Sequence, residues 1–451
     1  MKRVQRSKPV TVKALRPRRV DLRLTEDVSA KGLALKIWQM KDCEMENGCI
    51  QSLTEWNLAR RSNGQPYQYV NTNVLEVGSM PLDLGHGDYR ELYYMLTTDG
   101  SFIYYNEAKN GYYVMLAGKG KVKVCPVMGK DATVFALFTE KGFFIGDLLG
   151  NYQTVIEEDT LAAGAYFKHR IFVGMKGSEV RYSAPEDFLN FNESSDEGGR
   201  MRFSNCGGEI VAMQVYDDAL YIFFQSGILR LTASGEPSKF RAEQLDYAGD
   251  YILRRTVCVC QNAMYFMSAG GIYRVKGKRV DRLPVQLKLP IVENGKEGCA
   301  VWKDRPIFRY NQMGFKTIFL SSDGKTVYPM SDLKGLGRSA GGRVLFLDTS
   351  YQFCELINGG IYDYNGTFFT LETDFGYVGK KRLMNIYLQG EGTGFLTMTT
   401  DLGTIWVKQF AFVGGGTKLS LSEYGSLFAF RIELGPSSKI SAMQVEYTAR
   451  K

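Results

Sequence analysis

The side chains that could carry out chemistry are few and widely spaced in this chain of 451 residues. It has two histidines, His86 and His169, and eight cysteines without any CxxC pair. Two histidines offer little material for a zinc site or a Ser-His-Asp arrangement, and no GxSxG motif is present. Cys258 and Cys260 would share one face of a strand. We expect reduced, mostly buried thiols of a protein assembled in a cytosol, and we predict no catalytic site, no metal site and no cofactor.

A sialidase-like or glycan-active propeller is the enzymatic alternative. TTDLGTIW (399–406) approaches the Asp-box pattern of such propellers, and SSDGKTVY (321–328) is a poorer match. Asp boxes shape hairpins remote from the chemistry, so Thr400, Asp401 and Gly403 are most simply a strand, a turn and a strand. Glycoside hydrolysis also needs two carboxylates at a defined separation, and 48 scattered acidic residues do not identify a pair.

Two further function classes lack their usual motifs. The glycine-rich stretches GKGKVKV (118–124) and GGGTKLS (414–420) do not fit the GxxxxGK[ST] pattern of a nucleotide-binding loop. A propeller scaffold that binds protein partners is an alternative, but the repeated Trp-Asp or Gly-His dipeptides of the commonest version are missing.

Composition favours strands over helices. The chain holds 27 Tyr, 27 Phe and 49 Gly against 12 Pro, and aromatic residues with glycines favour pleated strands and tight turns. No apolar run approaches the 18 residues of a membrane span, and the first 20 residues lack the apolar stretch of a secretory signal.

The net charge of +8 is confined to one end of the sequence. Residues 1–23 carry nine Lys or Arg and one acidic residue, Asp21, whereas residues 24–451 hold 47 basic and 47 acidic groups. We interpret residues 1–23 as a basic arm, either a solvated tail or a segment that docks on an acidic partner surface. Its candidate docking cations are Arg16, Arg18, Arg19 and Arg23.

A unit of strand, glycine-containing turn and strand recurs from about residue 90. Such turns suit hairpins because their residues tolerate positive φ. Most repeats start about 37 to 54 residues apart, the period of a four-stranded propeller blade. The last interval is only about 27 residues, so one of those hairpins could be half a blade. We predict an all-β chain with a propeller of about six blades, with two β-sandwiches as the alternative. The hairpins begin at residues 91, 132, 169, 218, 262, 316 and 343.

The segments on either side of the repeats have different patterns. Residues 24–89 form an entry segment in which Leu33, Ile37, Trp38 and Met40 have helix-like spacing, with an extended segment as the alternative. Residues 370–451 alternate apolar and polar residues between glycine-rich turns, which favours a C-terminal β-sandwich. The predicted propeller therefore spans residues 90–369.

The stretch VRYSAPEDFLNF (180–191) predicts a structural corner. Ser183 stands where a helix N-cap would, Glu186 three residues later completes a capping box, and Pro185 suits the first turn. Phe188, Leu189 and Phe191 should direct apolar surface at a neighbouring strand or blade, after a strand that ends at Tyr182.

The corner is also where the sequence resembles a known family. RIFVGMKGSEVRYSAPEDFLNF (170–191), followed by GGEIVAMQVYDDALYIFFQSGILRLT (207–232), resembles the core of tail nozzle proteins of short-tailed bacteriophages, also called stabilisation or tail tubular B proteins. DCEMENGCIQSLTEWNLA (42–59) and FAFRIELGPSSKISAMQVEY (428–447) are similar to the family's entry and closing strands. The long basic arm and the scarcity of Trp depart from the family pattern.

The resemblance implies a virion component that is not an enzyme. Nozzle proteins form a homohexameric ring beneath the portal and adaptor, continue the DNA channel and close its far end until infection. The implied partners are other copies of the chain, the portal and adaptor proteins, and genomic DNA that passes without sequence-specific binding. A tail fibre or needle below the ring is a further candidate partner. The implied location is the phage tail, assembled in the host cytoplasm. A neutral body suits a channel wall, since a strongly basic wall would grip the DNA.

Overall fold

The computed structural model describes residues 17–26, 33–53, 55–71, 73–83, 89–107, 109–128, 133–147, 149–193, 197–233, 235–285, 287, 291–357, 362–363 and 365–449. These residues form strands, turns and one short 3₁₀ helix, η2 (Pro237–Lys239), and contain no α-helix. No helix among them is long and apolar enough to cross a membrane. The chain divides into two compact units: residues 56–360, and residues 1–55 together with 361–451.

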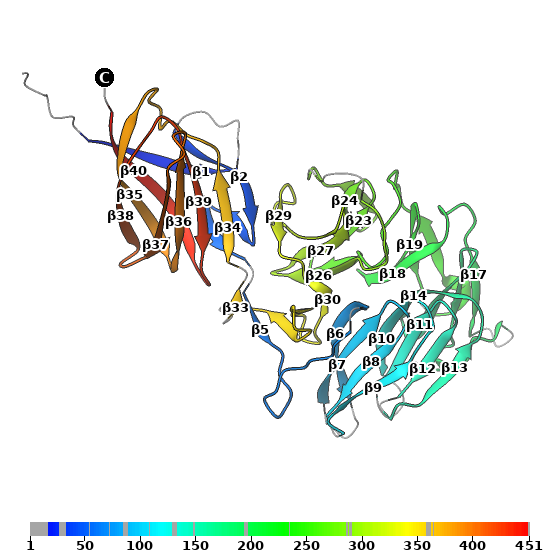
Figure 1. Cartoon of the computed structure of the whole chain (residues 1–451). Helices are drawn as coiled ribbons and strands as arrows, with labels where there is room; N and C mark the ends of the chain where they lie inside the picture. Colours follow the sequence, from blue (N-terminus) through cyan, green and yellow to red (C-terminus); the bar gives the residue numbers. More distant parts are fainter. Residues whose placement is uncertain are drawn as a thin grey trace, which may run out of the picture. The chain divides into compact units, whose positions relative to one another are not determined.

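The unit of residues 56–360 is a seven-bladed β-propeller, which confirms the predicted fold with one blade more than the central estimate (Figure 1). Six blades are four consecutive antiparallel strands, and the first strand of each blade lies toward the centre of the ring (Figure 1). Blades 1 to 3 comprise β6 (Val74–Asp83), β7 (Tyr89–Thr97), β8 (Phe102–Asn106) and β9 (Gly111–Leu116); β10 (Val122–Met128), β11 (Thr133–Thr139), β12 (Phe143–Gly146) and β13 (Tyr152–Ile156); and β14 (Thr160–Phe167), β15 (Arg170–Met175), β16 (Glu179–Tyr182) and β17 (Gly199–Arg202). Blades 4 to 6 comprise β18 (Ile210–Tyr216), β19 (Ala219–Phe224), β20 (Gly227–Thr232) and β21 (Arg241–Gln244); β22 (Cys258–Cys260), β23 (Ala263–Ser268), β24 (Gly271–Lys276) and β25 (Arg279–Arg282); and β26 (Gly298–Trp302), β27 (Arg305–Asn311), β28 (Phe315–Leu320) and β29 (Val327–Met330).

The seventh blade is completed by a strand from the other end of the propeller segment. Its consecutive strands are β30 (Lys334–Arg338), β31 (Val344–Leu347) and β32 (Phe353–Leu356). Strand β5 (Glu55–Leu58) pairs antiparallel with β32, with Leu58 opposite Cys354 and Trp56 opposite Leu356. The hydroxyl of Tyr93 in blade 1 also donates to Glu355 of β32 over 2.9 Å. The ring is therefore closed by backbone and side-chain bonds between its two ends.

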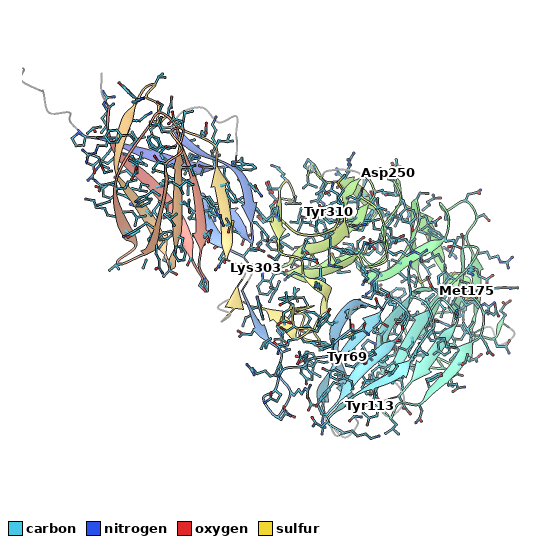
Figure 2. The ribbon with its side chains drawn as sticks, viewed as in Figure 1. Tyr69, Tyr113, Met175, Asp250, Lys303 and Tyr310 are labelled. Carbon is cyan, nitrogen blue, oxygen red and sulfur yellow. The ribbon has the colours of Figure 1, made fainter. Side chains whose placement is uncertain are left out.

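Apolar side chains fill the space between neighbouring blades. Separate buried clusters join blades 1 and 2, 2 and 3, 3 and 4, 4 and 5, 5 and 6, and 7 and 1. Met175 of β15 and Tyr310 of β27 belong to two of these clusters (Figure 2). Since each cluster draws on both of its blades, burying the apolar face of one blade requires its neighbour.

The second unit is a β-sandwich built from both ends of the chain. Its eleven strands run in the order β3-β4-β40-β1-β2-β34-β39-β36-β37, with β35 between β40 and β38. Strands β36, β39 and β40 bury alternate residues over most of their length, as expected for a sheet with one face in the core. The strands are β1 (Arg18–Thr25), β2 (Ala34–Lys41), β3 (Cys43–Glu46), β4 (Cys49–Ser52), β34 (Gly366–Thr370), β35 (Lys381–Glu391), β36 (Thr393–Thr400), β37 (Ile405–Ala411), β38 (Gly416–Gly425), β39 (Phe428–Leu434) and β40 (Lys439–Ala449). The short strand β33 (Tyr362–Asp363), which precedes β34 in sequence, belongs instead to the sheet of blade 7, where it follows β5.

The unit boundaries differ from the predicted ones. Residues 18–23, expected in a basic arm, lie in β1, which pairs antiparallel with β40. The segment predicted as partly helical or extended is extended where it is described: β2 to β4 belong to the sandwich, whereas β5 and β6 belong to the propeller. The sandwich therefore combines residues on both sides of the propeller segment, and the propeller is inserted within it along the sequence.

Candidate functional site

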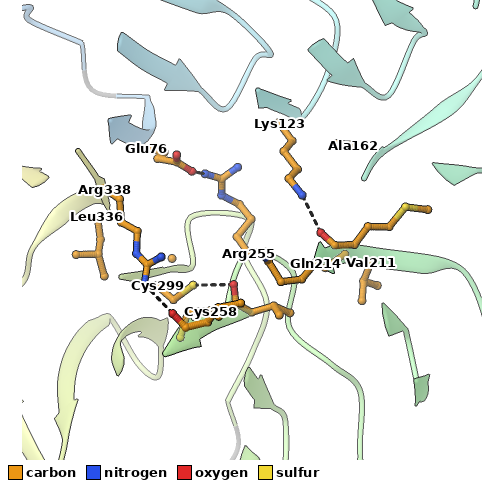
Figure 3. Close-up of a pocket in the computed structure, with 16 residues that line it drawn as sticks. Glu76, Lys123, Ala162, Val211, Gln214, Arg255, Cys258, Cys299, Leu336 and Arg338 are labelled. Atoms are coloured by element: carbon orange, nitrogen blue, oxygen red, sulfur yellow. Dashed lines mark hydrogen bonds and ion pairs between the residues drawn. The ribbon is translucent and has the colours of Figure 1, made fainter. Parts of the chain in front are cut away.

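The blades surround a cavity on the propeller axis, with a volume of about 220 Å³ (Figure 3). The first strand of every blade contributes to its lining, because those strands lie closest to the axis. The lining residues are Glu76, Lys123, Ala162, Val211, Ala212, Met213, Gln214, Arg255, Val257, Cys258, Val259, Gly298, Cys299, Leu336, Gly337 and Arg338.

The lining carries more positive than negative charge. Lys123, Arg255 and Arg338 come from three different blades, and within the described lining Glu76 is the sole carboxylate. The ammonium group of Lys123 donates to the carbonyl oxygens of Gly164 at 2.7 Å and Met213 at 2.8 Å. Burial lowers the pKa of Lys123, because the charged form loses its hydration.

Arg255 connects the fifth blade to the first and second. It precedes β22 and has a φ of 63°, in the left-handed region that a residue with a Cβ rarely occupies. Its guanidinium is bonded to the carboxylate of Glu76 in β6 and donates to the carbonyl oxygen of Val122 at 3.3 Å. The hydroxyl of Tyr94 donates to the other oxygen of Glu76 at 2.9 Å. Glu76 is thus fixed from two sides.

The Cys258 thiol beside the cavity is a poor nucleophile. Cys299 donates its thiol hydrogen to the carbonyl oxygen of Val257 at 3.3 Å. In the same lining, the guanidinium of Arg338 donates to the carbonyl oxygen of Val259 at 3.2 Å. Burial holds the pKa of Cys258 well above its usual value, so this thiol stays protonated at neutral pH. All eight cysteines are free, and the described residues contain no group of three or more side chains suited to a metal ion.

The cavity does not present an acid–base pair within the described residues. Glu76 has no second carboxylate beside it in the lining, and His86 lies outside the described residues. His169 is exposed on the β14–β15 turn, 3.6 Å from the carboxylate of Glu186. The Asp-box-like residues Thr400 and Asp401 lie at the β36–β37 hairpin of the sandwich unit, where Asp401 accepts the Ser426 N–H at 2.8 Å. That site forms the strand, turn and strand expected from the sequence.

The predicted corner has a different local structure from the one expected. Ser183 is buried, accepts the backbone N–H of Ile171 at 3.0 Å and donates to the carbonyl oxygen of Ala184 at 2.9 Å. Glu186 has a φ of 61°, so it cannot serve as the third residue of a capping box, and no helical turn forms. The expected helix N-cap is absent because of a tertiary contact. The hydroxyl of Ser183 accepts a hydrogen bond from strand β15 and not from the first turn of a helix.

The aromatic residues of the corner contact both neighbouring blades. Phe191 packs edge-on against Phe143 of blade 2 at 5.8 Å between ring centroids, and Phe188 packs against Tyr166 at 5.7 Å. Tyr182 instead belongs to the apolar cluster shared with blade 4. Leu189, Pro185 and Glu186 are exposed. The corner therefore contributes to both interfaces of blade 3.

Three of the four predicted docking cations lie in the described part of the chain, and Arg16 lies outside it. Arg18, Arg19 and Arg23 are exposed on strand β1. Arg19 donates to the hydroxyl of Tyr387 at 2.9 Å and lies 3.9 Å from the carboxylate of Glu446. The guanidinium of Arg18 lies 5.7 Å from the centre of the Tyr377 ring. Arg19 is therefore engaged within its own subunit.

The axial residues were not singled out from the sequence. They lie on the first strand of each blade, or just before it, whereas the repeated hairpins comprise later strands. The sequence does carry one indication of an axial residue. Lys123 is a cation inside the strand sequence VKVCPVM, and a lysine within a central strand would be buried, which is unusual for that residue type. Arg255 carried no such signal, because it lies in a connection between blades.

Comparisons with known proteins concern the fold alone. No family model and no curated protein matches the sequence. Among solved structures, the chain is similar to U3-55K, with 10% identity and a TM-score of 0.43 over 67% of this chain and 98% of that one. It is also similar to the computationally designed Ika8 protein, with 9% identity and a TM-score of 0.37 over 67% of this chain and 99% of that one. A third similar structure is that of an auxiliary nutrient binding protein from Bacteroides thetaiotaomicron, with 10% identity and a TM-score of 0.39 over 68% of this chain and 82% of that one.

Proposed function

We propose that this chain is a structural virion protein, the nozzle of a short-tailed bacteriophage tail. In this proposal six copies form a ring that continues the DNA channel below the portal and adaptor and closes it until infection. The observation that carries the proposal is the resemblance of residues 170–191 and 207–232 to nozzle proteins, together with the structural use of those residues. They contain β15 and β16 of blade 3, β18 to β20 of blade 4 and the corner that packs on blade 2.

The axial cavity supports a role without catalysis. Its cations are engaged by groups of the same chain: Lys123 by two carbonyl oxygens, Arg255 by Glu76, and Arg338 by a carbonyl oxygen. Such bonds fix the blades to one another and favour a rigid block. A channel wall under the pressure of packaged DNA needs rigidity more than it needs reactive groups.

The docking role rests on strand β1 and the residues before it. Arg18 and Arg23 are exposed and, with Arg16, provide cations for an acidic surface of the adaptor or of a neighbouring subunit. Arg19 contributes less, because it is already bonded to Tyr387. In this proposal a tail fibre or needle attaches on the side of the ring that faces away from the portal and adaptor.

The remaining features agree with assembly in the host cytoplasm and with passage of DNA. Eight free cysteines suit a reducing compartment. Residues 24–451 have equal numbers of acidic and basic groups, so the body of the protein offers no net positive charge to phosphates. DNA would pass through the channel without sequence-specific contacts.

Antibody labelling of intact virions tests this function. Gold-conjugated antibody raised against the purified chain should decorate the end of the tail distal to the capsid in electron micrographs. Label confined to host material, or particles that never bind the antibody even after mild tail disruption, would refute the proposal. Antibody raised against the major capsid protein serves as the control for particle integrity.

A further inference from the structure

The axial cavity has an unbalanced charge that the protein itself does not neutralise. Three cations face one carboxylate, which leaves two positive charges in a confined space between the blades. Charges of one sign in a cleft with low-dielectric walls raise the local concentration of counter-ions. An anion from solution is the simplest species that would balance them.

Two of the cations that line the cavity have a hydrogen-bond donor without an acceptor among the described residues. Nε of Arg255 is buried and has no hydrogen-bond partner among the described residues, although the other guanidinium nitrogens are bonded. An ammonium group has three donors, and two of those of Lys123 are used by Gly164 and Met213. An oxygen-rich ligand in the cavity would satisfy the third donor of Lys123, whereas Nε of Arg255 is covered by protein atoms and becomes available only if the guanidinium turns toward the cavity.

We propose that the propeller axis binds one small tetrahedral oxyanion, phosphate or sulfate. Arg255, Lys123 and Arg338 would supply the donors, and these come from three blades. A liquid water molecule occupies about 30 Å³, so a cavity of about 220 Å³ has room for a five-atom ion. The ion would stabilise the ring of blades, because it contacts blades that are distant in sequence. This inference is independent of hexamer formation.

Glu76 provides a way to distinguish the two ions. Monohydrogen phosphate carries a proton that it can donate to a carboxylate, whereas sulfate at neutral pH carries none. Glu76 lines the cavity beside Arg255. If the ion contacts Glu76, phosphate should bind more tightly than sulfate. If it contacts only the cations, the two should bind alike.

Isothermal titration calorimetry on the full chain tests the site. Sodium phosphate and sodium sulfate are titrated separately into protein held at constant ionic strength with sodium chloride. We expect saturable binding of one ion per chain. Arg255→Gln or Arg338→Gln should weaken it by about tenfold or more, because each removes a charge-assisted hydrogen bond. Glu76→Gln should tighten the binding of sulfate, because it removes the one opposing charge.

Arg254→Gln is the matched control. Arg254 adjoins Arg255 in sequence, but it lies near Glu140 and Glu293 and is not part of the cavity lining. This variant should bind as the unchanged protein does. Circular dichroism establishes that each variant is folded, and Arg338→Gln, which loses one carbonyl contact, covers the case in which Arg255→Gln unfolds.

Three results would overturn the inference. These are the absence of saturable heat for either ion at millimolar concentration, an equal loss of affinity in the Arg254 and Arg255 variants, and unchanged affinity in both Arg255→Gln and Arg338→Gln. Stabilisation in a thermal melt does not suffice as support, because sulfate and phosphate stabilise many proteins by exclusion from their surfaces.

Discussion

The guanidinium of Arg255 is bonded to the carboxylate of Glu76 across the propeller axis, over 179 residues of sequence. The bond links the connection before blade 5 with the innermost strand of blade 1, so it holds together blades that do not adjoin. Both side chains are mostly buried, with 17% and 25% of their surfaces exposed. Arg255 also has a left-handed backbone conformation, which indicates that the surrounding contacts determine its position.

Removal of one partner from this pair should destabilise the propeller. Arg255→Gln leaves Glu76 as a partly buried carboxylate without its cation, and we expect a loss of about 2 kcal/mol in the free energy of unfolding, reduced from a fully buried pair by solvent screening. Urea unfolding followed by tryptophan fluorescence measures it. In a double-mutant cycle, adding Glu76→Gln should cost less than the sum of the two single changes.

The matched control for this pair lies on the surface. Lys278 and Glu243 are 2.9 Å apart, with 66% and 45% of their side chains exposed. Lys278→Gln should change stability by less than about 0.5 kcal/mol. Equal effects of Arg255→Gln and Lys278→Gln would contradict a structural role for the axial pair.

The hairpins were predictable because they depend on neighbouring residues. The seven recurrent units are hairpins, one in each of the seven blades. The short spacing between the last two, at residues 316 and 343, has a local explanation. The unit at residue 316 is the outer hairpin β28–β29, whose Asp323-Gly324 turn is easily recognised. The equivalent inner hairpin β27–β28 turns at Gln312, Met313 and Gly314, which lack a standard two-residue hairpin pair. That is why the blade number was underestimated.

The discontinuous sandwich was not predictable from local patterns. Pairing of Leu22 with Met443 joins residues at opposite ends of the sequence, and neither segment specifies the other. The helix-like spacing of Ile37 and Met40 has a different cause. Strand β2 contains a register irregularity between Ile37 and Gln39, so the alternation shifts by one residue and both apolar side chains are buried. An irregular strand of this kind imitates the period of a helix.

The buried hydroxyl of Ser183 provides a second test. Its removal in Ser183→Ala leaves the N–H of Ile171 without its acceptor, and we expect a loss of about 1 to 2 kcal/mol in unfolding free energy. Ser226→Ala is the control, because its hydroxyl is exposed and contacts only the carbonyl oxygen of Gly207. Equal stabilities of the two variants in urea titrations would show that the hydroxyl of Ser183 contributes no more than a surface group.

Glu186→Gly separates the observed corner from a capping box. The left-handed φ of Glu186 suits glycine, and the side chain is exposed, so the substitution should be neutral or stabilising by up to about 1 kcal/mol. A capping box predicts the opposite sign, since its third residue would be lost. Thermal unfolding of the single variant measures the difference, and a clear loss of stability would contradict the corner described above.

Stability at alkaline pH should depend on Cys43. This thiol is buried in the sandwich and donates to the carbonyl oxygen of Thr367 at 3.5 Å, and burial raises its pKa from 9.0 to about 12. Below pH 9.0 both the folded and the unfolded state hold the proton. Above it the unfolded state releases the proton first, so stability falls until the pH passes the folded pKa.

The comparison is between the unchanged protein and Cys43→Ala. Between neutral pH and about pH 10.5, the unchanged protein should lose on the order of 2 kcal/mol more of its unfolding free energy than the variant does. Urea titrations at several pH values under reducing conditions measure both slopes. Parallel slopes would show that the thiol ionises equally easily in both states.

Two deletions separate the fold from the docking role. Removal of residues 1–23 takes away most of β1, including the buried Leu22 and the partner of Tyr447. The sandwich should then become sensitive to limited proteolysis and lose at least about 2 kcal/mol of stability. Removal of residues 1–16 retains all of β1 and should leave stability unchanged, but it should weaken assembly. Equal assembly of the shorter deletion and the full chain at the same salt concentration would exclude docking by those residues.

Electron microscopy of the purified full chain over a range of concentrations tests the nozzle proposal most directly. The proposal predicts closed rings of six copies with a central opening, seen in top views and growing in abundance with concentration. Single subunits, or chains of subunits that never close, at every concentration would contradict it.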